Sequence, residues 1–207
     1  FNKLIDFFGA GYGLTESANL VSGNASAPYK AASVGQFYPY QEYKIVNGEL
    51  YIKGDNLMLG YYNDPEENAK AFDQEGYFKT GDLVRVDEEG FLYITGRTKE
   101  IIVLPNGENV SPAYIESKIN EIALIQDSLV YEDKNEFGIV ILVAELLPRE
   151  QVLREKKIGN LEEYLNKKIE EVNQSLLPHE RIGKVIVRKE DFPRTPSMKI
   201  VRPKREI

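Results

Sequence analysis

The sequence changes its pattern across Gly96-Arg97-Thr98-Lys99-Glu100-Ile101-Ile102-Val103, and this stretch decides the fold. Before it, residues 35–96 alternate short apolar runs with glycine, proline and Asn-Gly, which is typical of antiparallel strands. After it, strand-like runs alternate with amphipathic segments, which predicts a small domain of mixed strands and helices. We therefore predict an α+β protein, with an antiparallel β-rich subdomain (a partial barrel) within residues 1–98 and a small α+β domain at residues 99–207.

Local sequence signals in the first part predict two hairpins and a short helix. Asn47-Gly48 divides the apolar residues of 43–53 and favours the positive φ angles of a type I′ turn. Asp64 followed by Pro65 is typical of a helix start, with the carboxylate as the cap. A second hairpin is expected at residues 83–94, where a polar turn precedes Phe91.

The second part predicts helices and strands in alternation. Apolar residues recur at helical spacing after Ser111 and again after Leu161, and Pro178 ends the longer segment. The expected elements are a strand at 101–103, a loop at 105–109, a helix from Ser111, strands at 127–131 and 138–145 around a turn at 132–136, a helix from Leu161, and a strand at 184–188.

The composition of the 207 residues excludes several classes of function. A net charge of -7 argues against general binding of nucleic acid. The absence of cysteine removes disulfides, thiolate nucleophiles and cysteine-ligated metals, and a cytoplasmic location is the default expectation. No apolar run approaches the ~18 residues of a membrane span, and residues 1–8 do not resemble a signal peptide. Because the sequence begins with Phe1, we expect the natural start of the protein to lie upstream.

The first chemistry-bearing segment is Gly11-Tyr12-Gly13-Leu14-Thr15-Glu16. Glycine lets the backbone approach a ligand, and tyrosine can stack on a flat ring. A threonine hydroxyl can donate to a phosphate oxygen, and a glutamate can hold a hard cation such as Mg²⁺. The plainer interpretation is a polar turn after a buried strand.

Two further segments carry polar groups near the pattern change. Asp82, after Thr80-Gly81, is a good acceptor for two adjacent ribose hydroxyls, or it caps a turn before a strand at Leu83. Arg97 can reach a ribose or a phosphate with its planar guanidinium. Lys99 lies where the two patterns meet and is a candidate hinge, whereas the plainer interpretation is a linker with solvated charges.

The fourth segment is Pro193-Arg194-Thr195-Pro196-Ser197-Met198-Lys199. A lysine on a turn can present a point charge to a phosphoryl group, while the competing interpretation is a disordered basic tail. His179 is the only histidine and follows Leu177-Pro178, which favours a surface or capping role. One histidine without cysteine supports neither a zinc site nor a catalytic triad.

In their order and spacing, the four segments resemble the adenylate-forming superfamily of acyl-CoA synthetases, adenylation domains and luciferases. The shared pattern is Tyr-Gly-x-Thr-Glu, Thr-Gly-Asp, Gly-Arg-x-Lys and Pro-x-Thr-x-x-x-Lys, and it covers nearly the whole chain. Residues 101–103 and 107–110 most resemble the fatty acyl-CoA synthetases.

The resemblance implies a role for each matched residue. The adenine side of a nucleotide site would be lined by Gly11, Tyr12 and Gly13. Thr15 would contact the α-phosphate, Glu16 would bind Mg²⁺, and the ribose would be contacted by Asp82 and Arg97. Lys99 would be the hinge, Gly107 would lie on the CoA channel, and Lys199 would be the adenylating lysine. The implied enzyme activates a fatty acid with MgATP to an acyl-AMP and transfers the acyl group to CoA as its C-terminal domain moves.

The sequence departs from the family pattern in two respects. Met198 stands where the family has glycine, and no Ser/Thr/Gly-rich loop ending in Lys-Gly occurs in the chain. We therefore expect a fragment that is inactive alone and exposes apolar surface suited to self-association. The alternatives are an adenylation domain that loads a carrier protein and a non-catalytic interaction module with the same fold.

Overall fold

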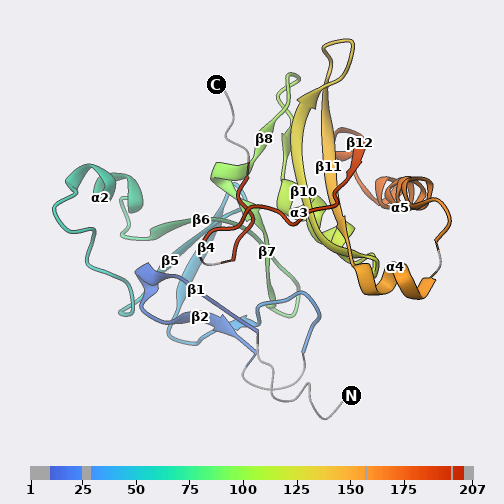
Figure 1. Cartoon of the computed structure of the whole chain (residues 1–207). Coiled ribbons are helices and arrows are strands. Elements are labelled where there is room, and N and C mark those ends of the chain that lie inside the picture. Colours follow the sequence, from blue (N-terminus) through green and yellow to red (C-terminus); the bar gives the residue numbers. More distant parts are fainter. Residues whose placement is uncertain (1–9, 25–28, 157, 197, 203–207) are drawn as a thin grey trace. The chain divides into compact units, whose positions relative to one another are not determined.

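The structure is a computed structural model that describes residues 10–24, 29–156, 158–196 and 198–202 (Figure 1). The chain divides into two compact units, Phe1–Lys99 and Glu100–Ile207, one residue beyond the predicted boundary. The chain contains both helices and mainly antiparallel sheets, which confirms the predicted α+β class. No sheet in the described residues closes into a barrel. Within those residues, no helix has the length and apolar character needed to cross a membrane.

Short antiparallel strands dominate the described part of the first unit. In chain order its elements are β1 (Gly11–Gly13), the 3₁₀ helix η1 (Thr15–Ser17), β2 (Leu20–Gly23), β3 (Gln36–Phe37), β4 (Glu42–Val46), β5 (Glu49–Lys53), α2 (Pro65–Ala71), β6 (Phe78–Val86) and β7 (Leu92–Arg97). Strands β1, β2 and β3 form one sheet, and β4 to β7 form a second in chain order.

The local predictions for this unit are confirmed. Asn47 and Gly48 have φ angles of 51° and 83° and join β4 to β5, as a type I′ turn requires. The Asp64 side chain accepts a hydrogen bond of 3.0 Å from the Glu67 amide and caps α2. Strand β6, however, begins five residues before the predicted position at Leu83. The sequence did not predict this longer strand, because polar side chains are buried among the apolar ones in its first half.

The second unit combines a three-stranded sheet with helices. The 3₁₀ helix η2 (Thr98–Glu100) spans the boundary between the units. The elements after it are β8 (Ile102–Val103), β9 (Asn109–Val110), α3 (Pro112–Asn120), β10 (Ile125–Lys134), β11 (Val140–Pro148), α4 (Glu150–Lys156), α5 (Leu161–Ser175), η3 (Pro178–Glu180) and β12 (Ile182–Val187). Strand β10 pairs antiparallel with β11, and β11 pairs parallel with β12. The parallel pairing is possible because helices α4 and α5 carry the chain back between these strands.

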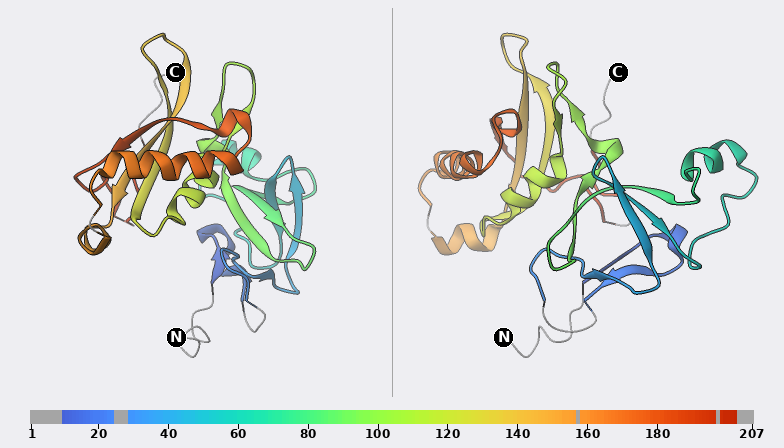
Figure 2. Two further views of the ribbon diagram at one scale, coloured as in Figure 1. Left: turned by 90° about the vertical axis from the view of Figure 1, so that its right-hand side faces the viewer. Right: turned by 180° about the vertical axis from the view of Figure 1, so that it is seen from behind.

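The two faces of this sheet carry different layers. Helices α3 and α5 pack on one face, where Ile115 and Leu165 are fully buried with Val130 of β10, and Figure 2 shows α5 lying across the strands. On the opposite face Phe192 is buried against Leu129 and Leu147, with Ile200 packed beside them. Because side chains alternate along a strand, one sheet supports both layers. The chain after β12 therefore covers the face that the helices leave open.

Several predicted elements in this unit need correction. The turn between β10 and β11 lies at Asn135–Gly138 instead of 132–136, because β10 continues through polar residues to Lys134 and β11 begins only at Val140. Asn109, expected at the end of a loop, pairs with Val103 as part of β9. Helix α4 was not predicted. Arg194 and Ile200 form an isolated bridge, which contradicts the alternative of a disordered tail at these residues.

Candidate functional site

A buried carboxylate joins three strands of the first unit. Tyr12 Oη of β1 donates to Asp82 Oδ2 of β6 at 2.7 Å, and Arg97 Nε of β7 donates to Asp82 Oδ1 at 2.7 Å. The Asp82 side chain is 7% exposed, whereas that of Arg97 is 50% exposed. Thr80 Oγ1 donates to the Leu50 carbonyl and accepts from the Asp82 amide, which fixes the backbone at this point. The structure thus brings together three predicted site residues, which we call the Asp82 cluster: Tyr12, Asp82 and Arg97.

The chemistry of the Asp82 cluster is that of a fixed acceptor. Burial, and then the hydrogen bond to Asp82, raises the pKa of the Tyr12 hydroxyl, so it remains a donor at neutral pH. A carboxylate offers about four acceptor positions, so two protein donors leave Asp82 able to accept from ligand hydroxyls. Such a group, held rigidly and partly dehydrated, suits recognition of a diol.

Glycine is required beside Tyr12 by close packing. A Cβ at Gly13 would lie 2.6 Å from the Asn19 carbonyl oxygen and 3.0 Å from Leu20 Cα, which are backbone atoms with little freedom to move. Gly11 and Gly13 are both exposed, so the backbone on either side of Tyr12 is open to a ligand.

The next two predicted residues lie on η1. Thr15 is exposed, and Glu16 Oε1 accepts a hydrogen bond of 3.0 Å from Tyr61 Oη. No cluster of three or more metal-ligating side chains occurs among the described residues. A lone carboxylate nevertheless fits Mg²⁺, which binds through one or two carboxylates together with substrate phosphates and water. Tyr61 was missed as a partner of Glu16 because 45 positions separate the two residues.

Lys199 lies in a hydrogen-bonded turn of the second unit. The Thr195 amide donates to the Lys199 carbonyl at 2.8 Å, and the Lys199 amide donates to Thr195 Oγ1 at 3.2 Å. The Lys199 side chain is exposed. Met198 has a φ of 65°, in the left-handed region that glycine enters without steric cost. The turn therefore holds its shape with a methionine at a position that favours glycine.

The predicted hinge and channel residues are both exposed. Lys99 lies in η2, and Gly107 occupies the turn between β8 and β9, with its amide donating to the Leu104 carbonyl at 2.8 Å. Glu108 Oε1 lies 3.2 Å from His179 Nδ1 of η3. The only histidine thus contacts the Gly107 turn, a contact that the sequence did not reveal because 71 positions separate the two side chains in the chain.

The comparisons with known proteins identify the family. Residues 99–206 match the model of the AMP-binding enzyme C-terminal domain. The chain belongs to this family. The resemblance to adenylate-forming enzymes predicted from the four segments is thereby confirmed. The roles of the individual site residues stay predictions.

Relatives of this member of the AMP-binding enzyme C-terminal domain family include CoA ligases. The long-chain-fatty-acid–CoA ligase ACSBG1 of Rattus norvegicus is 37% identical over 140 residues, covering 64% of this chain and 19% of the relative. The probable CoA ligase CCL5 of Humulus lupulus is 32% identical over 208 residues, covering 93% of this chain and 35% of the relative. The crystal structure of ATP-bound MatB from Rhodopseudomonas palustris has a TM-score of 0.75 at 26% identity, covering 93% of this chain and 38% of that one. The chain therefore spans well under half of the proteins it matches.

Proposed function

We propose that the protein containing this chain is an ATP-dependent acyl-CoA ligase that activates a fatty acid. The observation that carries the proposal is the Asp82 cluster, a rigid acceptor suited to the ribose of a nucleotide. The membership of residues 99–206 in the AMP-binding family supports ATP as the nucleotide. The relatives named as long-chain-fatty-acid–CoA ligases support a fatty acid as the second substrate.

In the first half-reaction, a carboxylate oxygen of the fatty acid attacks the α-phosphorus of ATP. The bond to the β-phosphate breaks, pyrophosphate leaves, and an acyl-AMP remains. Asp82 accepts from the ribose hydroxyls, Arg97 lies beside them, and Gly11, Tyr12 and Gly13 line the adenine side. Thr15 donates to the α-phosphate, and Lys199 stabilises the charge that develops there. Glu16 holds Mg²⁺, which neutralises phosphate charge when bound.

In the second half-reaction, the thiol of CoA attacks the acyl carbonyl of the acyl-AMP. The carbon–oxygen bond to AMP breaks, AMP leaves with the bonding electrons, and the thiol proton passes to solvent. We propose that rotation near Lys99 withdraws Lys199 and brings the Gly107 turn to the CoA channel between the two steps. The chain alone contains no glycine-rich phosphate loop, so it is expected to form no acyl-AMP.

The test uses the full-length protein with a long-chain fatty acid and MgATP. Lys199→Ala is expected to slow acyl-AMP formation by about 100- to 1000-fold, the effect of losing one strong charge-stabilising group. Supplying purified acyl-AMP and CoA measures thioester formation separately, and this rate should not depend on Lys199. Acyl-AMP formation at an unchanged rate would refute the role of Lys199.

A second acceptor is distinguished by the same assay. An adenylation domain that loads a carrier protein would form acyl-AMP but transfer it to a phosphopantetheinyl carrier in preference to free CoA. A non-catalytic module would form no acyl-AMP with any fatty acid. Comparing CoA with a carrier protein as the acceptor therefore separates the three functions.

A further inference from the structure

The segment that carries Lys199 is pinned at both ends to the same strand, β10. Arg194 precedes Lys199 by five positions and contacts Asp127, while Arg202 follows it by three positions and contacts the Val130 carbonyl. We propose that Arg194 and Arg202 are positioning residues that set where the Lys199 ammonium stands during adenylation. This inference rests on the proposed function of Lys199.

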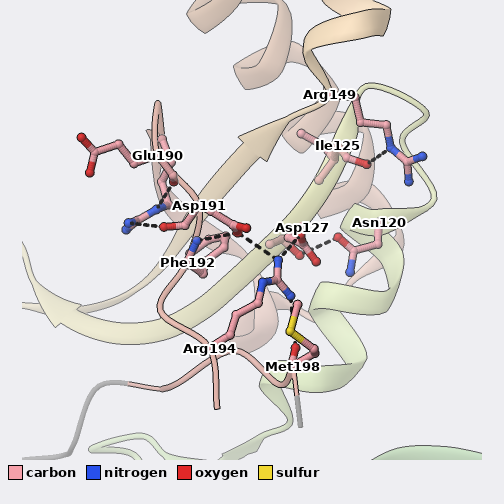
Figure 3. A network of polar contacts seen from close by, with 11 residues as sticks. Asn120, Ile125, Asp127, Arg149, Glu190, Asp191, Phe192, Arg194 and Met198 are labelled. Carbon is pink, nitrogen blue, oxygen red and sulfur yellow. Dashed lines mark hydrogen bonds and ion pairs between the residues drawn. The ribbon is translucent and has the colours of Figure 1, made fainter. Parts of the chain in front are cut away.

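Arg194 forms the first pin, which Figure 3 shows from close by. Its Nη2 donates to Asp127 Oδ2 at 2.7 Å and to Asp191 Oδ1 at 2.9 Å, while Nη1 donates to the Met198 carbonyl at 3.2 Å. The Arg194 side chain is 20% exposed. The guanidinium thus links β10 to the backbone directly before Lys199. Arg194 and the Phe192 amide lower the pKa of Asp191, so that carboxylate stays charged at neutral pH.

Arg202 forms the second pin. Its Nη1 and Nη2 donate to the two carboxylate oxygens of Glu116 at 2.7 Å each, and its Nε donates to Glu100 Oε2 at 3.1 Å. Glu116 in turn accepts from the Val130 amide at 2.7 Å, so the pair is anchored to both α3 and β10. A bidentate pair fixes orientation as well as distance. Glu100 directly follows the proposed hinge residue Lys99, so this pin connects the Lys199 segment to the start of the second unit.

Apolar packing between the pins orients the segment. Ile200 packs with Phe192, Leu129 and Leu147 on the face of the sheet opposite the helices. Lys199, its neighbour, is exposed. The segment therefore has a buried side and a solvent side, and the two arginines prevent it from sliding along the strand.

The pins matter for adenylation because electrostatic stabilisation depends on distance. The Lys199 ammonium sits on a flexible stem, so its reach is set by the backbone of its turn. Displacing a catalytic group by about 1 Å lowers a rate by about 100-fold. Thioester formation does not use Lys199 in the proposed cycle, so a loss of position affects one half-reaction alone.

The experiment measures both half-reactions in the full-length protein. Arg194→Ala and Arg202→Ala are expected to slow acyl-AMP formation by about 10- to 100-fold. The rate of thioester formation from supplied acyl-AMP should stay within about twofold of the parent rate, which is the variation expected when the changed residue is not coupled to that step. In a Lys199→Ala background, each arginine change should add less than about twofold to the loss, because the group being positioned is already gone.

A matched control is Arg154→Ala, since Arg154 pairs with Glu150 on α4 and both side chains are 81% exposed. It should leave both half-reactions unchanged. Asp127→Asn removes the charged partner of Arg194 while keeping its shape, and should slow adenylation alone even where Arg194→Ala fails to fold. A parallel fall in both half-reactions, or a full additional loss on top of Lys199→Ala, overturns the inference. A normal adenylation rate in Lys199→Ala overturns the proposed role of Lys199 and the inference with it.

Discussion

Tyr12→Phe removes one oxygen from the Asp82 cluster and tests how strongly that cluster stabilises the first unit. The lost hydrogen bond is 2.7 Å long and ends on a carboxylate whose side chain is 7% exposed. Hydrogen bonds to charged groups contribute about 1.5–3 kcal/mol, and burial hinders water from replacing the lost donor. We therefore expect the free energy of unfolding to fall by about 1.5–3 kcal/mol.

Thermal unfolding followed by tyrosine circular dichroism measures this change. For a domain of this size each kcal/mol shifts the melting temperature by about 4–8 °C, so the transition of the first unit should fall by about 6 °C or more. Tyr62→Phe is the matched control, because Tyr62 is 93% exposed, and it should change stability by less than about 0.5 kcal/mol. Equal melting temperatures for the two variants would refute the reasoning.

The same variant has a pH signature. The pKa of Tyr12 is higher in the folded than in the unfolded state, first because of burial and then because of Asp82. Its contribution to stability is fully present below pH ~10 and is lost as the pH rises toward the folded-state pKa. Urea unfolding between pH 8 and 11 should therefore show a decline above pH ~10 that is smaller in Tyr12→Phe.

Three further predictions concern packing, acid stability and the Lys199 turn. Leu165→Ala empties a fully buried site and should lower the free energy of unfolding in urea by about 2–5 kcal/mol. Leu177→Ala is the control and should lower it by less than about 0.5 kcal/mol, because Leu177 is 57% exposed. Lys30 lowers the pKa of Asp87 to about 2, so Lys30→Met should destabilise the chain above pH ~4 and the difference should vanish as the pH falls toward 2 in urea titrations. Met198→Gly should stabilise the turn by about 0.5–1 kcal/mol, because left-handed strain of about 1–2 kcal/mol outweighs the entropy of glycine. A faster exchange of the Thr195, Met198 and Lys199 amides in that variant would contradict the last prediction.

Local sequence rules predicted the elements that depend on near neighbours. The Asn47-Gly48 turn and the Asp64 cap each involve residues within four positions, so propensity and hydrogen-bonding chemistry suffice. The full length of β6 was not predictable in this way, because Thr80 and Asp82 are polar and yet buried. Their burial is stabilised by partners from β5, β1 and β7, which no local window contains.

The sequence by itself determined the family, the candidate site residues and most of the helices and strands. Only the tertiary structure decided which of those residues meet. Asp82 and Tyr12 are 70 positions apart, and Arg202 and Glu116 are 86 positions apart. The residues next to a polar side chain in the sequence do not indicate its partner, because the partner is brought close only when the whole chain folds. Motif order therefore revealed what chemistry to expect, while folding decided which groups hold Asp82 and the Lys199 turn in place.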